Sequence, residues 1–118
     1  MKLYQIINAQ PVLDEISKNK NLPTRTAYQI YVLLSKLETS IQFFENQRME
    51  LFRKYGVSDG DNLVIPDENY ESFKKEIDEL GNLDCEEEIA KIDIGLDVDL
   101  GVSPSEISVL IPFFNFLD

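Results

Sequence analysis

The fold is decided by the stretch from Pro23 to Gly56, which reads PTRTAYQIYVLLSKLETSIQFFENQRMELFRKYG. Proline is well tolerated in the first turn of a helix, and Pro23 stands at the start of this stretch. Lys54 and Gly56 form a stop signal, because a cation suits the last turn and glycine suits a left-handed position after it. No other glycine or proline lies in the stretch. It therefore predicts one helix over about residues 23–55, roughly 45–50 Å long.

An apolar seam runs along this helix in alternating steps of three and four residues. It comprises Ala27, Ile30, Leu34, Leu37, Ile41, Phe44, Leu51 and Tyr55. Arg48 takes the slot between Phe44 and Leu51, so the seam is a heptad pattern with one polar interruption. The first half is also apolar on its other sides, through Tyr28, Tyr31, Val32 and Leu33. Such a helix must be covered on several sides.

A shorter helix is expected before the long one. Asn8 is a good N-cap, and the apolar residues that follow it recur at helical spacing as far as Lys18. The short aliphatic and aromatic run over Lys2–Ile7 predicts a strand ahead of this helix.

A second shorter helix is expected after the long one. It begins at Pro66–Glu68, where acidic residues suit the positive end of a helix, and it ends at Gly81. Only a turn over Val57–Asn62 and a brief extended piece separate it from the long helix. We therefore expect the two helices to pack antiparallel, with Phe73 and Ile77 against the second half of the long helix.

From Ile92 to Leu100 the sequence alternates between two kinds of residue. Ile92, Ile94, Leu96, Val98 and Leu100 share one face, and Asp93, Gly95, Asp97 and Asp99 share the other. Alternation of this kind predicts a half-buried acidic strand within about residues 89–100, with a bulge at Gly95.

The last part of the chain carries a clear helix start. Ser103–Glu106 is a capping box with proline at the first helical position. It predicts a short helix with Ile107, Leu110 and Ile111 facing inward. The apolar tail Phe113–Leu117 is expected to dock on the long helix.

These elements predict a single domain over residues 1–118 of the α+β class, mainly helical. A long central helix carries two shorter helices packed on it as a helical hairpin, beside a small β-sheet that includes the acidic strand.

Charge is unevenly distributed along the chain. Residues 1–56 carry eight basic and five acidic side chains, whereas residues 57–118 carry three and seventeen. An acidic half of this kind repels phosphate groups, so binding to nucleic acid and to anionic membranes is disfavoured. The surface is either simply well solvated or shaped to dock a basic partner.

The residue types argue against catalysis. The chain has no histidine and one cysteine, Cys85, which lies among acidic residues that disfavour its thiolate. The loop Asp59–Asn62 lacks the oxygen ligands and the glycine that an EF-hand needs at later positions. We expect no enzymatic activity, no catalytic residue, no metal site and no cofactor.

Four side chains of the long helix are candidates for an interface: Tyr31, Val32, Phe52 and Arg48. The flanking elements offer too little apolar surface to cover a helix of this length, so a two-fold dimer is expected. Arg48 has two readings. It either lies at the edge of the helix pair with its head in water, or faces a carboxylate of the second shorter helix or of another chain.

Several segments resemble a family of small uncharacterised proteins encoded by tailed phages and prophages of Gram-positive bacteria. The resemblance rests on Asn21–Tyr28, Phe44–Arg48, Lys54–Gly56, Ile65–Glu68, Glu88–Ile92 and Val102–Glu106 followed by Pro112-Phe113. It covers nearly the whole chain and implies a phage origin without a known activity.

The function expected from these observations is that of a non-enzymatic phage accessory or structural protein. It would act through protein–protein interaction with itself and with a phage or host protein, in the host cell cytoplasm or associated with the virion. The alternative is an acidic inhibitor that mimics nucleic acid and blocks a host defence protein.

Overall fold

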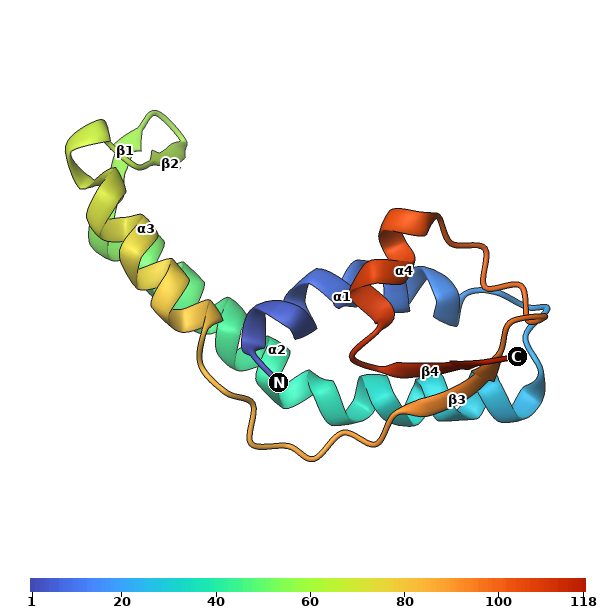
Figure 1. Cartoon of the computed structure of the whole chain (residues 1–118). Coiled ribbons are helices and arrows are strands. Elements are labelled where there is room, and N and C mark those ends of the chain that lie inside the picture. Colours follow the sequence, from blue (N-terminus) through green and yellow to red (C-terminus); the bar gives the residue numbers. More distant parts are fainter.

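A computed structural model describes all 118 residues and confirms a mainly helical α+β fold built on one long helix (Figure 1). The elements in chain order are α1 (Leu3–Ser17), α2 (Thr24–Tyr55), β1 (Val57–Asp59), β2 (Asn62–Val64), α3 (Asp67–Gly81), β3 (Ile92–Gly95), α4 (Pro104–Leu110) and β4 (Phe114–Leu117).

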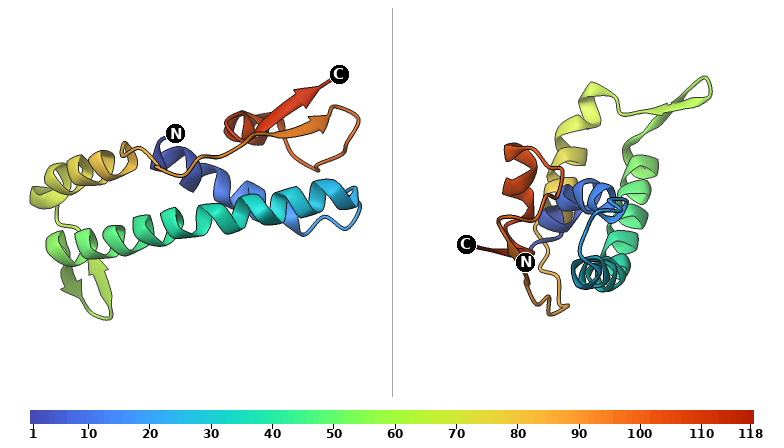
Figure 2. Two further views of the ribbon diagram at one scale, coloured as in Figure 1. Left: turned by 90° about the horizontal axis from the view of Figure 1, so that it is seen from below. Right: turned by 90° about the vertical axis from the view of Figure 1, so that its right-hand side faces the viewer.

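The two shorter helices α1 and α3 lie end to end along α2, each antiparallel to it (Figure 2). α1 covers the N-terminal half of α2, and α3 covers the C-terminal half. They meet near the middle, where the Leu3 amide donates to the Leu83 carbonyl and the Cys85 amide donates to the Met1 carbonyl. The predicted packing of two shorter helices on the long one is therefore confirmed.

The predicted strand over Lys2–Ile7 is wrong, because α1 already begins at Leu3. Only Lys2 is extended, and it forms an isolated bridge with Asp84. The apolar residues of this segment continue the helical stripe of α1, whose buried face comprises Leu3, Ile6, Ala9, Val12, Leu13 and Ile16. Pro11 lies inside the helix on its exposed side.

The core lies where α1, the first half of α2 and the C-terminal elements meet. We call this part the body, residues 1–44 and 80–118. All of the buried apolar residues belong to it, among them Ile6, Leu13, Leu37, Leu110 and Phe113. Along α2 the predicted seam holds at Ile30, Leu37, Ile41 and Phe44, but Leu33 and Thr26 are buried in place of Leu34 and Ala27.

The C-terminal elements form a β3–α4–β4 unit with parallel strands. Ile92 is opposite Phe114, and Gly95 is opposite Leu117. The observed strand β3 is therefore shorter than the strand predicted within residues 89–100. Gly95 ends the strand at a turn rather than forming a bulge, and the amide of Val98 donates to its carbonyl. Beyond this turn Leu96 is exposed.

The capping box that starts α4 is confirmed, and two details after it are corrected. Ser103 Oγ accepts from the Glu106 amide, and the Glu106 carboxylate accepts from the Ser103 amide. Leu110 is buried, but Ile107 and Ile111 are exposed. The apolar tail pairs with β3, and it is β3 that contacts α2.

At the far end of α2 the chain reverses through a β-hairpin before α3. The predicted turn over Val57–Asn62 contains β1 and the start of β2, joined by a two-residue loop. Gly60 has a φ of 65° at the first loop position, which is the backbone geometry that favours glycine there. Gly56 is extended rather than left-handed, at φ −83°. A β-carbon on it would lie 2.7 Å from Cγ of Leu63 and would collide with the Phe52 carbonyl oxygen.

We call residues 45–79 the arm: the end of α2, the β-hairpin and most of α3. It projects from the body and makes the molecule 51 Å long and 30 by 23 Å across (Figures 1 and 2). The radius of gyration is 17.2 Å. A compact chain of this length would have about 13–14 Å.

Candidate interaction surface

The four candidate interface residues lie in two separate places on α2. Tyr31 and Val32 belong to the body, whereas Arg48 and Phe52 lie one turn apart on the arm. About 30 Å of helix separates Tyr31 from Phe52. The four residues therefore do not form one surface.

Phe52 and Arg48 are engaged inside the arm. The ring of Phe52 meets the ring of Phe73 on α3 edge to face, with centroids 4.9 Å apart. The guanidinium of Arg48 lies 5.7 Å from the centroid of Phe52 and pairs with the Glu45 carboxylate at 2.8 Å. Arg48 thus has its carboxylate partner on its own helix rather than on α3, and its side chain stays partly exposed.

Tyr31 and Val32 lie on different sides of α2. Tyr31 is 67% exposed and stacks loosely on Tyr28, with ring centroids 6.5 Å apart. Val32 is half-buried and lines a cavity of about 210 Å³ between α2 and residues 89–92. Tyr28 and Tyr31 are the most exposed aromatic side chains of the body.

The arm as a whole, beyond Arg48 and Phe52, is a surface that the sequence analysis did not single out. No residue between Phe44 and Leu80 is buried, although this part contains two helices and a β-hairpin. Its exposed apolar side chains are Met49, Val57, Leu63, Val64 and Tyr70. One signal was available in the sequence: the helix predicted to begin at Pro66–Glu68 and to end at Gly81 is the only long element expected beside this half of α2.

The helix contact in the arm is anchored by a small polar cluster. The Lys54 ammonium donates to the Glu76 carboxylate at 3.2 Å and lies 5.1 Å from the ring centroid of Tyr55. Hydrogen bonding from Tyr55, and then from Lys54, holds the pKa of Glu76 below its ordinary value. Hydrogen bonding to Glu76 raises the pKa of Lys54. The cluster is open to water, so its contribution to stability is modest.

The two helices of the arm carry different charge. From Glu45 to Tyr55, α2 has three basic and two acidic side chains, a net charge of +1. α3 has two basic and six acidic side chains, a net charge of −4. A surface that presents α2 of the arm is thus complementary to one that presents α3.

No three or more Cys, Asp and Glu side chains are gathered to hold a metal ion. Cys85 Sγ lies 3.3 Å from the Ser40 hydroxyl, on the edge of the core. None of the four helices combines the length and apolar content needed to cross a lipid bilayer.

Comparison with known protein families, with curated proteins and with solved structures finds no match.

Proposed function

We propose that this chain is a non-enzymatic interaction protein that self-associates through its arm. The observation that carries the proposal is the absence of any buried residue between Phe44 and Leu80. An isolated two-stranded hairpin is marginally stable in water, and short helices need tertiary packing to persist. A second copy laid on the arm supplies that packing.

The charges of the arm favour a two-fold arrangement. In such a dimer, α2 of one arm packs against α3 of the other, and the reverse contact forms by symmetry. In each of the two symmetric contacts, the α2 segment with a net charge of +1 then faces α3 with a net charge of −4. The four helices form a small bundle whose centre takes up apolar side chains such as Met49 and Tyr70.

Sedimentation equilibrium tests the proposal when the wild type is compared with Met49→Glu/Tyr70→Glu. Both side chains are exposed in the single chain, and glutamate is a good helix former, so the variant retains its fold. At tens of micromolar we expect the wild type at twice the 13.6 kDa chain mass and the variant at the chain mass.

The matched control is Tyr28→Glu/Tyr31→Glu, which places the same charges on the exposed tyrosine pair of the body. We expect this control to remain dimeric. A wild type at the single-chain mass would overturn self-association. Loss of the dimer in the tyrosine variant alone would move the interface from the arm to the surface around Tyr31.

The setting we propose follows from the resemblance to phage and prophage proteins. In a bacterial host the same arm is available to a phage or host protein that competes with the second copy. A nucleic-acid mimic is less well supported, because a continuous row of carboxylates is lacking on the exposed side of α3. There Lys74 and Lys75 alternate with Glu71, Asp78 and Glu79.

A further inference from the structure

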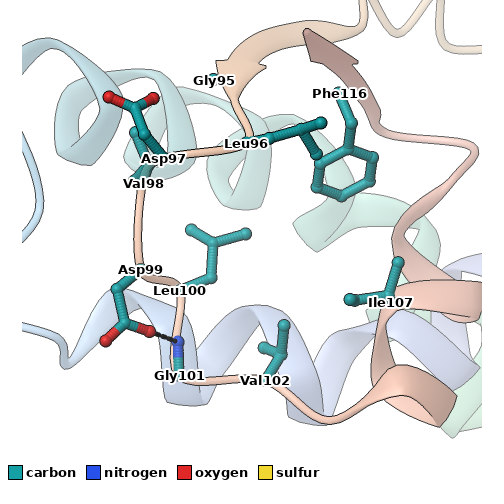
Figure 3. Close-up of a pocket in the computed structure, with 10 residues that line it drawn as sticks. All are labelled: Gly95, Leu96, Asp97, Val98, Asp99, Leu100, Gly101, Val102, Ile107 and Phe116. Atoms are coloured by element: carbon teal, nitrogen blue, oxygen red, sulfur yellow. Dashed lines mark hydrogen bonds between the residues drawn. The ribbon is translucent and has the colours of Figure 1, made fainter. Parts of the chain in front are cut away.

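The β3–α4–β4 unit encloses a pocket that the arm does not involve. The loop from Gly95 to Val102 borders a pocket, whose lining side chains are drawn in Figure 3. Its volume is about 350 Å³. Its apolar lining comprises Leu96, Val98, Leu100, Val102, Ile107 and Phe116. Leu96 is 63% exposed at this pocket, and Ile107 is also exposed. The unit therefore keeps an apolar hollow that nothing in the chain fills.

The pocket lies where parallel strands commonly present a ligand site. In open sheets with helical crossovers, ligands bind beyond the carboxyl ends of the strands. Gly95 and Leu96 follow the end of β3, and Phe116 belongs to the last residues of β4. The pocket fits a binding site better than a packing defect, because both of its walls, α4 and the loop over residues 95–102, are held in place by buried side chains. Leu100 and Leu110 are buried in the core.

The charge around the pocket selects against anions. Residues 92–118 contain no lysine or arginine, and their acidic residues are Asp93, Asp97, Asp99, Glu106 and Asp118. None of these five forms an ion pair. Asp97 makes no side-chain hydrogen bond, and Asp99 Oδ1 accepts only from the Gly101 amide, at 2.9 Å. A phosphate or carboxylate ligand would be repelled here.

No lysine or arginine of the chain forms an ion pair with Asp97 or Asp99. The Asn19 amide side chain donates to the Asp99 carbonyl, which brings the α1–α2 loop beside the pocket. Lys18 in that loop is paired with Glu15, and Lys20 forms no ion pair. The Asp97 and Asp99 carboxylates, on the outer side of the loop (Figure 3), therefore have no ion-pair partner within the chain and can pair with cations of another molecule.

We propose that this pocket binds a peptide segment of a partner protein, with a bulky apolar side chain flanked by lysine or arginine. The apolar side chain enters the hollow between Leu96, Ile107 and Phe116. The flanking cations reach over the loop to Asp97 and Asp99, whose carboxylates lie on its outer side, away from the hollow (Figure 3). A peptide fits better than a small molecule. Small-molecule sites enclose most of their ligand, whereas the exposed Leu96 and Leu117 extend the apolar surface beyond the hollow.

Titration of the ¹⁵N-labelled full chain by NMR tests this site with three synthetic peptides of equal length. The first has leucine and phenylalanine between lysines. The second replaces the two apolar residues by serine, and the third replaces the lysines by glutamate. We expect amide shifts over residues 95–102 and at Ile107 and Phe116 with the first peptide alone.

Variants that remove charge distinguish a specific contact of the peptide with Asp97 and Asp99 from a general attraction between a basic peptide and an acidic protein. Asp97→Asn/Asp99→Asn keeps the acceptor for the Gly101 amide and should weaken binding about 2- to 30-fold, as expected for two exposed ion pairs. The control Glu86→Gln/Glu87→Gln removes the same charge from an exposed segment and should leave binding within about 2-fold.

A second variant tests the apolar part. Leu96→Ser removes a mostly exposed side chain and should weaken binding at least several-fold while the thermal midpoint stays near that of the wild type. The proposal is overturned if the glutamate peptide gives the same shifts, if the two charge variants lose affinity equally, or if Leu96→Ser binds like the wild type. Variants of the arm should leave this binding unchanged, so failure here and failure of the dimer are distinguishable.

Discussion

Phe113 and Phe73 show how differently the body and the arm hold an aromatic ring. Phe113 is fully enclosed after α4, whereas Phe73 is half-buried between α2 and α3. Phe113→Ala should lower the free energy of unfolding by about 3–5 kcal/mol, and Phe73→Ala by about 1–2 kcal/mol, because less apolar contact is lost. Chemical denaturation at low protein concentration measures both. Equal losses would contradict the division into body and arm.

Glu76 and Lys54 make the arm sensitive to pH in a definable range. The lowered pKa of Glu76 means that its contribution to stability is present above the ordinary value of 4.5 and lost as pH falls through the folded pKa. The raised pKa of Lys54 means that its contribution is present below 10.5 and lost as pH rises through the folded pKa.

The test is Glu76→Gln, compared with Glu79→Gln, which removes a charge from α3 outside the contact. The difference in unfolding free energy between wild type and Glu76→Gln should be largest between pH 4.5 and pH 10.5 and should shrink at lower and at higher pH. Thermal unfolding followed across pH measures it. If Glu76→Gln is still less stable than the wild type at pH 2, the loss of stability does not come from the charge of the Glu76 carboxylate.

At the scale of elements, α4 depends on its capping box. Ser103→Ala removes the acceptor for the Glu106 amide at the start of this seven-residue helix. We expect a loss of about 0.5–2 kcal/mol in unfolding free energy, and Ser103→Asp should restore most of it because aspartate is an equally good cap. Denaturant melts of the two variants measure this. If alanine is tolerated without loss, the cap is not what holds α4.

The elements with strong end signals were predictable from the sequence. The proline start and the cation-and-glycine end of α2, the acidic start of α3 and the capping box of α4 all lie where they were expected. Each signal is local, because it acts within one or two turns of the helix end. The capping box of α4 does so by hydrogen bonds, whereas Pro23 and Pro66 start their helices without a side-chain cap. The fold class followed from these three helices together with the strand pattern.

Elements that depend on distant partners were not predictable. Lys2–Ile7 is an apolar run whose length suits a strand or a helix, and its place in α1 is decided by packing against α2. The alternation from Ile92 to Leu100 continues past Gly95, but the strand ends there because the chain turns, with the Val98 amide donating to the Gly95 carbonyl. Neither fact is visible in the residues themselves.

The candidate surface was only partly predictable, for a similar reason. The seam through Arg48 and Leu51, next to Phe52, indicates which side of α2 is apolar, but not whether α3 or another chain covers it. The ring contact between Phe52 and Phe73 assigns that side to α3. The exposed apolar residues of the arm became apparent from the packing alone.

At the scale of the whole molecule, the chain divides into a body with a core and an arm without one. All buried apolar residues lie in the body, while the arm extends the long axis to 51 Å. Regions with few buried contacts open locally at low free energy. In the single chain, the arm should therefore open more readily than the body, and a second copy should suppress that opening.

Hydrogen–deuterium exchange at two protein concentrations tests this claim most directly, because it reports which amides become protected on association. We compare exchange at about 1 µM and about 100 µM, which changes the extent of self-association by mass action. Amides of residues 45–79 should exchange more slowly at the higher concentration, while those of the body stay unchanged. Protection of the arm that is independent of concentration, or a gain confined to the helix around Tyr28 and Tyr31, would contradict self-association through the arm.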